Sequence, residues 1–289
     1  MMPGHEHGAE GTDAPSAFFV GARVALVIEY DGSGFHGWQV QPNARTVQAE
    51  LERALAAVAT QPIATICAGR TDTGVHALSQ VVHFDVPCAR PPNAWTMGLN
   101  SNLPDDVRVL SATPVDGDFH ARFGAVSRTY RYVVLNRAHP SPLARQRSYW
   151  QRQALDIEAM REAAAHLVGE HDFSAFRAAS CQAPNPIRTV QAISIDATSP
   201  WVTIDITANA FLQNMVRIVV GSLLRVGRGE ATPAWMGEVL QAGDRRHRGK
   251  TAPPQGLFFA AVRYEARFGV PSDPTSYAPS DQSSIIMAP

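Results

Sequence analysis

The chain has 289 residues, of which 45% are apolar and 18% are charged, and its formal net charge at pH 7 is −1. This length and apolar content suffice for one large domain or two smaller ones, and they exclude global disorder, a collagen-like repeat and a coiled coil. No membrane span is expected, because Arg217 and Arg225 interrupt the most apolar stretch, residues 211–227. Three cysteines without a CxxC pair predict neither a disulfide framework nor a zinc site, and they fit a reducing cytoplasm.

The first half of the chain alternates β-type runs with helical patterns. Residues 23–30 (RVALVIEY) form a β-rich apolar run that ends at an Asp-Gly turn signal. Thr46 can cap a helix whose apolar stripe consists of Val47, Leu51, Leu55 and Val58. Further strands are expected at residues 63–68, 80–86 and 107–115, and a helix is one interpretation of residues 91–103.

The second half repeats this mixture. Strands are expected at residues 128–135, 187–197, 201–208 and 257–264, and helices at residues 157–167 and 211–226. Strand pairs joined by short turns, with few helices between them, predict an α+β fold that is mostly antiparallel rather than a doubly wound sheet.

The composition also suggests where domains begin and end. A break near residues 116–119 divides the body of the chain into two domains, 21–117 and 118–267. The tails, residues 1–20 and 268–289, are expected to be disordered because they are rich in Gly, His and Ala or in Pro and Ser. The first residues carry no basic segment followed by an apolar one, so no secretory signal is expected.

Charge is distributed unevenly along the chain. The tails hold five acidic residues and no Lys or Arg, which leaves a net charge of +4 on the body. Seven arginines and no acid lie between Asp118 and Asp156, and a second basic cluster lies at residues 245–250. Such segregation suits a phosphate-binding face, although a solvated arginine-rich surface is the alternative. The candidate RNA contacts are Arg122, Arg128, Arg131, Arg245, Arg246 and Arg248.

Asp72 is the first candidate for chemistry, since it lies in a glycine-flanked loop (GRTDTG) between two apolar strands. The alternative is an ordinary turn aspartate bonded to backbone amides. Arg70, two residues away, is expected to keep the carboxylate ionised and to lower its pKa. Arg217 lies inside an apolar helix, where its charge requires either a partner such as Asp72 or a route for its head group to solvent.

Other catalytic signatures are weaker. Residues 72–74 (DTG) spell the aspartic-protease triplet, but such enzymes share one proton between two carboxylates, and the chain has one triplet with Arg70 beside it. His76 and His83, like His5-Glu6-His7 in the first tail, do not have convincing metal-ligand spacing. A P-loop, a GxGxxG loop and a GxSxG nucleophile context are all missing from the sequence.

Tyr130 and Tyr132 alternate with arginines in the strand-like segment RTYRYVV. Aromatic rings beside guanidinium groups stack unpaired bases and hold the adjacent phosphates. Half-buried strand tyrosines are the alternative interpretation.

Several blocks that contain these residues resemble the tRNA pseudouridine synthase A family, over roughly residues 23–265. The blocks that carry the resemblance are ALVIEYDGSGFHGWQVQ, AGRTDTGVHALSQVVHFD, FHARFGAVSRTYRYVV, LVGEHDFSAFR, NAFLQNMVRIVVG and KTAPPQGLFFAAV. The resemblance implies a pseudouridine synthase fold, in which two mixed α/β domains with mostly antiparallel sheets flank a basic RNA-binding cleft. It also implies a homodimer that isomerises uridine to pseudouridine at positions 38–40 of the tRNA anticodon stem-loop, without a cofactor or metal.

The resemblance assigns roles to four residues. The catalytic aspartate of the family falls on Asp72 and the arginine of the same motif on Arg70. The tyrosine that contacts the target base falls on Tyr130, and the helix arginine that pairs with the catalytic carboxylate falls on Arg217. Thr73 replaces a common alanine, a small change that should leave the loop intact. Gln213-Asn214 replaces histidines of some members, so no essential chemistry is expected at residues 213 and 214.

A non-catalytic tRNA-binding or tRNA-folding protein on the same scaffold is the rival interpretation. Such a protein would keep the basic segments and Tyr130 but would not need an aspartate between two arginines. The presence of Asp72, Arg70 and Arg217 together therefore favours an enzyme.

Overall fold

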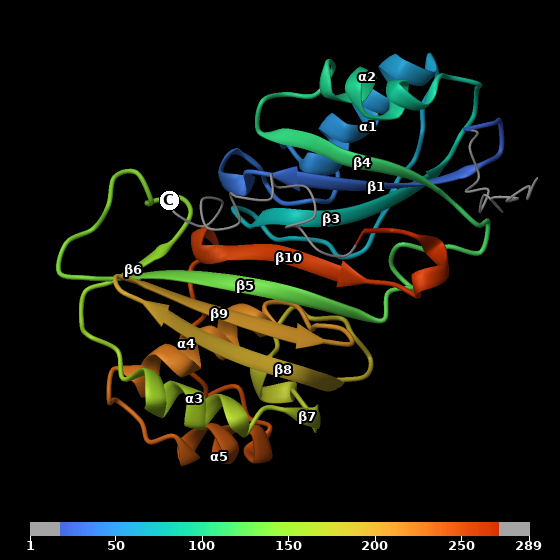
Figure 1. The fold of residues 1–289 in the computed structure, drawn as a ribbon. Coiled ribbons are helices and arrows are strands. Elements are labelled where there is room, and N and C mark those ends of the chain that lie inside the picture. Colours follow the sequence, from blue (N-terminus) through green and yellow to red (C-terminus); the bar gives the residue numbers. More distant parts are fainter. Residues whose placement is uncertain (1–17, 272–289) are drawn as a thin grey trace, which may run out of the picture.

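The computed structural model describes residues 18–271, and its strands join in one ten-stranded sheet (Figure 1). The order along the main path is β4-β1-β3-β10-β5-β9-β8-β7, with β2 paired to β3 and β6 paired to β5. The β3–β10 and β5–β6 pairs are parallel and the remaining pairs of this sheet are antiparallel, which confirms the predicted α+β class. The strands are β1 (Arg23–Tyr30), β2 (Ile66–Cys67), β3 (His76–Asp85), β4 (Val107–Val115), β5 (Ser127–Asn136), β6 (Tyr149–Gln151), β7 (Gly169–Asp172), β8 (Ile187–Thr198), β9 (Trp201–Ala208) and β10 (Leu257–Arg263).

Helices cover the two halves of this sheet separately. In Figure 1, α1 and α2 lie beside β1 and β4, whereas α3, α4 and α5 gather beside β8 and β9. No helix within residues 18–271 has the length and apolar character needed to cross a membrane. The helices are α1 (Val47–Ala59), α2 (Met97–Asn100), α3 (Ile157–Ala165), α4 (Met215–Gly227) and α5 (Ala234–Ala242).

Local sequence signals explain several of these elements. The Thr46 hydroxyl accepts a hydrogen bond from the backbone N–H of Ala49 (3.4 Å), which caps α1 as predicted. The predicted helix at 211–226 begins four residues late, at Met215. The reason is that Asn214 has a left-handed backbone (φ 60°), so residues 211–214 form a loop.

Two hydrophobic clusters make up the core, and β10 contributes to both. Phe259 packs in the cluster formed around β1 and α1, whereas Leu257 packs in the cluster formed around β5, β9 and α4. The C-terminal strand thus joins the two halves of the sheet by pairing with β3 on one side and β5 on the other. The division into domains 21–117 and 118–267 stays a prediction.

The described chain extends into the second predicted tail. Phe268 lies in a 3-10 turn (Ala266–Phe268) and is buried in the first hydrophobic cluster. The greater part of both predicted tails, 1–17 and 272–289, lies outside the described residues, and so does His5-Glu6-His7.

Candidate active site

The loop that carries Asp72 connects β2 to β3 and is held by the segment that follows β1. The backbone N–H of Trp38 donates to the carbonyl of Thr71 (3.0 Å). Gly37 has φ +86°, and a β-carbon there would lie 2.7 Å from the Thr71 carbonyl oxygen, so this close approach requires glycine. The glycine-rich YDGSGFHGW segment therefore sets the path of the loop.

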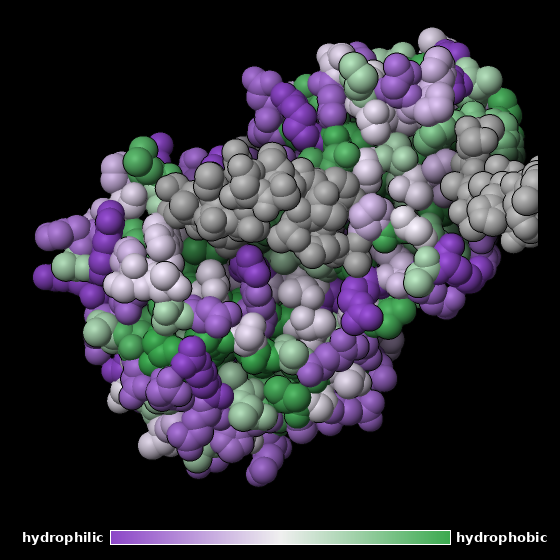
Figure 2. All heavy atoms as spheres, viewed as in Figure 1, coloured by the Kyte–Doolittle hydropathy of each residue, from purple (hydrophilic) through white to green (hydrophobic). Residues whose placement is uncertain are grey.

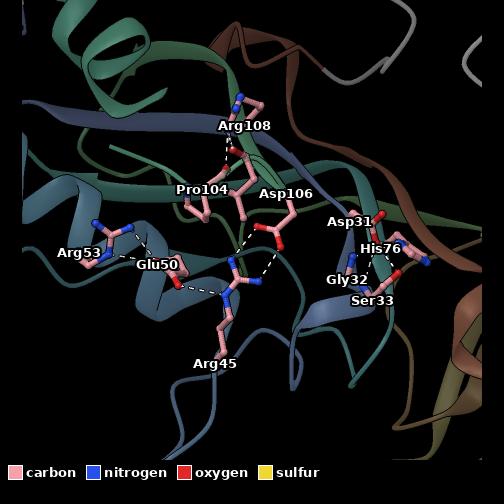
Figure 3. Close-up of polar contacts among 11 residues, drawn as sticks. Asp31, Gly32, Ser33, Arg45, Glu50, Arg53, His76, Pro104, Asp106 and Arg108 are labelled. Carbon is pink, nitrogen blue, oxygen red and sulfur yellow. Dashed lines mark hydrogen bonds and ion pairs between the residues drawn. The ribbon is translucent and has the colours of Figure 1, made fainter. Parts of the chain in front are cut away.

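His76 fixes the end of the same loop. Its side chain is only 2% exposed, and its Nε2 lies 2.7 Å from the carbonyl oxygen of Gln146. The backbone N–H of Gly32 donates to Nδ1 (3.1 Å), and Figure 3 shows the ring beside Gly32 and Asp31. His76 thus links three segments that are distant in the sequence, and its burial fits a structural role.

Arg217 on α4 approaches the Asp72 carboxylate, with 3.6 Å between Nη1 and Oδ2. Its Nε donates to the carbonyl of Ala252 (2.7 Å), and Nη1 donates to Oδ1 of Asn214 (3.1 Å). The Arg217 side chain is 17% exposed and that of Asp72 is 41% exposed. The head group of Arg217 is therefore engaged within the protein, and the alternative in which it escapes to solvent is wrong.

The ionisation of Asp72 differs from the sequence-based expectation. Burial raises the pKa of Asp72, and the charge and hydrogen bonding of Arg217 oppose this rise without reversing it. Arg70 is exposed and forms no ion pair among the described residues, so the prediction that Arg70 lowers this pKa is wrong. A carboxylate with a raised pKa is a stronger base and nucleophile when ionised.

A cleft of about 940 Å³ opens in front of Asp72, and Tyr130 of β5 lines it. The Tyr130 ring packs edge-on against Phe211 (4.9 Å between centroids) and Phe259 (5.1 Å). Burial raises the pKa of Tyr130, and the nearby charge of Asp72 adds to the effect, so the hydroxyl keeps its proton at neutral pH. The structure thus places the predicted tyrosine and aspartate in one cleft, with the ring fixed by its neighbours.

Four further arginines line this cleft, and they fall into two kinds. Arg128 donates to the backbone carbonyls of Ala68, Ala125, Asn209 and Arg122, so it fastens the cleft walls together. Arg70 and Arg122 are exposed and Arg188 is half-buried, so these three side chains are accessible for contact with a polyanion.

The other predicted RNA contacts lie elsewhere. Arg131 forms an ion pair with Asp205 (2.6 Å) and occupies the opposite face of β5 from Tyr130, since side chains alternate along a strand. Arg246 forms an ion pair with Asp244 (2.6 Å), and neither it nor Arg245 or Arg248 lines the cleft.

The remaining arginines of the basic segment are exposed between the end of β5 and the start of α3. Figure 2 shows mainly hydrophilic atoms on the protruding loop between β5 and β6, at the left of the view. The continuous basic segment of the sequence is thus divided among the cleft, the opposite face of the sheet and this outer loop. The four arginines exposed between β5 and α3 are Arg137, Arg145 and Arg147 in the β5–β6 loop and Arg152 just after β6.

Phe123 and Arg188 are among the cleft residues that sequence reasoning missed. Phe123 is 77% exposed at the cleft, with the guanidinium of Arg122 5.4 Å from its ring centroid. Arg188 has a buried Nε without a hydrogen-bond partner in the described part of the chain. An aromatic residue beside an arginine in HARFG was an available signal for Phe123, whereas nothing in the local sequence distinguishes Arg188.

The chain is similar in sequence to known proteins over most of its length. The family model described as tRNA pseudouridine synthase matches residues 26–124 and 163–265. The protein named tRNA pseudouridine synthase A from Methylococcus capsulatus is 48% identical over 90% of this chain and 100% of its own length. The protein of the same name from Nitrosococcus oceani is 51% identical over 86% of this chain and 96% of its own.

Among solved structures, a Cbf5-Nop10-Gar1 complex aligns with 69% of this chain and 54% of its own, at 11% identity. The TM-score of 0.30 is too low to identify a fold. The family model and the relatives cover both the Asp72 loop and the helix of Arg217. The chain belongs to the tRNA pseudouridine synthase family, whose members are isomerases.

Proposed function

We propose that this chain isomerises uridine to pseudouridine in tRNA, at positions 38, 39 and 40 of the anticodon stem-loop. Its relatives named tRNA pseudouridine synthase A support tRNA as the substrate, and the resemblance supports the three positions. The single observation that carries the chemistry is the ion pair of Asp72 with Arg217 in a cleft that Tyr130 also lines.

The reaction breaks the N1–C1′ bond, turns the uracil ring and joins C5 to C1′, while C5 loses a proton and N1 gains one. Asp72 acts at the sugar, as a nucleophile or as a base. A glycosidase uses two carboxylates and delivers water to the sugar. Asp72 is the only carboxylate among the described residues that line the cleft, and this favours isomerisation over hydrolysis.

The target uridine must leave the stem to reach Asp72, which costs a few kcal/mol of stacking. The Tyr130 ring, held by Phe211 and Phe259, offers a surface on which the displaced base can pack. Arg70 and Arg122 provide charge for the adjacent phosphates without reading base identity. This mode of binding suits an enzyme that accepts three neighbouring positions.

The positions are tested by mapping pseudouridine in an unmodified tRNA transcript after incubation with the protein. Carbodiimide adducts of pseudouridine stop reverse transcription, and we expect stops at positions 38–40 with the native protein and none with Asp72→Asn. Stops at other positions would contradict the proposed site. Tight tRNA binding without any modification would support the rival, a non-catalytic tRNA-binding protein.

The proposal includes a homodimer in the cytoplasm that needs no cofactor or metal. The dimer rests on the family resemblance, and light scattering of the purified protein tests it. The compartment is supported by Cys67, Cys88 and Cys181, which are free thiols.

A further inference from the structure

We propose that Asn214 is a positioning residue whose side-chain oxygen holds the Arg217 guanidinium in the orientation that faces Asp72. This inference rests on the proposed function, in which the ionised Asp72 does the chemistry. It concerns a residue for which the sequence predicted no essential role.

Asn214 directly precedes α4, where an asparagine side chain ordinarily caps the helix by accepting from a backbone N–H. Here its side chain makes no capping bond, and its backbone is left-handed at φ 60°. Its Oδ1 instead accepts from Nη1 of Arg217 (3.1 Å). Because a guanidinium has donors only, the amide oxygen rather than the amide nitrogen must face it.

A second acceptor holds the other side of the guanidinium. The carbonyl of Ala252 accepts from Nε of Arg217 (2.7 Å), and the N–H of Ala252 donates to the Arg217 carbonyl (2.9 Å). The same Nη1 that Asn214 binds lies 3.6 Å from Oδ2 of Asp72. Without the amide of Asn214, Nε stays anchored at Ala252, but Nη1 loses the acceptor that fixes its direction.

The orientation of Arg217 matters because few titratable or charged groups face Asp72. Arg217 comes from α4, Tyr130 comes from β5, and Arg70 lies on the loop of Asp72 itself. Burial raises the pKa of Asp72, and Arg217 opposes this rise. Displacement of the guanidinium therefore makes the carboxylate harder to ionise, and the loss of activity should be greatest at acidic pH.

The test compares Asn214→Gly with Asn43→Gly. Glycine removes the amide but accepts a left-handed backbone without strain, so Asn214→Gly should fold. Asn43 has nearly the same backbone (φ 58°), is exposed and does not line the cleft, so it is a matched control. Single-turnover isomerisation is measured from about pH 5 to about pH 8.5, with tRNA affinity and thermal unfolding measured in parallel.

For Asn214→Gly we expect the acid limb of the rate profile to move to higher pH, so that the rate loss is greater at the acidic end of the range than near pH 8. The affinity for tRNA should be unchanged, and Asn43→Gly should follow the native profile. A loss that is the same at every pH, or no loss, would overturn the proposal.

A second measurement does not depend on turnover. Carbon-13 NMR follows the titration of the Asp72 carboxyl, assigned by its absence in Asp72→Asn. Its midpoint should lie higher in Asn214→Gly than in the native protein, and an unmoved midpoint would overturn the positioning role. If the native protein modified no tRNA, the proposed function would fail while this titration still decided the role of Asn214.

Discussion

Arg217 and Asp72 approach to 3.6 Å, although one lies on a helix in the second half of the chain and the other on a loop in the first half. Burial raises the pKa of Asp72, and Arg217 opposes that rise. The pair thus keeps a partly buried carboxylate available in a cleft where it would otherwise take up a proton more readily. Loss of the Asp72 charge should therefore abolish catalysis without lowering the stability of the fold at neutral pH.

Asp72→Asn should abolish turnover without destabilising the protein at neutral pH. A carboxyl whose pKa is raised by folding contributes stability below its ordinary pKa of 3.8, and this contribution is lost as the pH rises through the raised value. At neutral pH the native protein carries this penalty, and the uncharged amide removes it. Thermal unfolding at about pH 7 and about pH 4 measures the effect. A variant that is markedly less stable than the native protein at neutral pH alone would contradict the raised pKa.

Tyr130→Ala should reduce activity far more than Tyr130→Phe if the ring mainly stacks on the displaced base. Stacking on an aromatic side chain contributes about 1–3 kcal/mol per base, which corresponds to a loss of about 5- to 150-fold for the alanine variant. The phenylalanine variant keeps the edge-on contacts with Phe211 and Phe259. Equal losses in single-turnover rate would show instead that the hydroxyl is the important group.

Arg70→Ala and Arg122→Ala should each weaken tRNA binding and reduce the slope of log affinity against log salt by about one. Both side chains are exposed in the cleft, where they can neutralise phosphates. Arg246→Ala removes the same charge from an exposed arginine that pairs with Asp244 outside the cleft, and it should leave the slope unchanged. A reduced slope for Arg246→Ala would extend the RNA contact beyond the cleft.

Gly221→Ala should disturb the active site through the segment that packs on α4 one turn after Arg217. A β-carbon at Gly221 would lie 1.7 Å from the carbonyl oxygen of Lys250, so the segment that carries Ala252 must move. Overpacking of this kind costs about 1–3 kcal/mol, and displacement of Ala252 removes an anchor of Arg217. Urea unfolding and single-turnover rates measure the two effects.

Gly98→Ala is the control for this substitution. Its β-carbon would make only ordinary contacts, 3.6 Å or more from its neighbours, within the short helix α2. We expect its activity to equal that of the native protein and its stability to be equal or higher, because alanine favours a helix more than glycine does. Normal activity in Gly221→Ala would show that the Ala252 anchor is dispensable.

The sequence predicted the elements with the clearest patterns. The expected strands at 23–30, 107–115 and 201–208 have the bounds of β1, β4 and β9, because each is a β-rich run closed by turn residues. The strand expected at 63–68 is reduced to β2 (Ile66–Cys67), and β6, β7 and α5 were not predicted. Their lengths depend on neighbours that a local pattern does not contain.

In the site, too, the residues that belong to clear sequence motifs were predicted, and the features that depend on distant residues were not. The motifs located Asp72, Tyr130 and Arg217, and the structure brings all three to the cleft. The direction of the Asp72 pKa shift could not be predicted, because it depends on burial by residues distant in the sequence. The backbone of Asn214, which delays the start of α4 to Met215, could not be predicted either, since an asparagine in an apolar run does not by itself indicate a left-handed conformation.

Release of hydrogen from C5 of labelled uridine is the most direct test of the central claim. The substrate is an unmodified tRNA transcript with uridines at positions 38–40, incubated with the purified protein and no added cofactor or metal. We predict release by the native protein and none by Asp72→Asn, while both bind the transcript with similar affinity. Release by Asp72→Asn, or no release by a native protein that binds the tRNA tightly, would contradict the account.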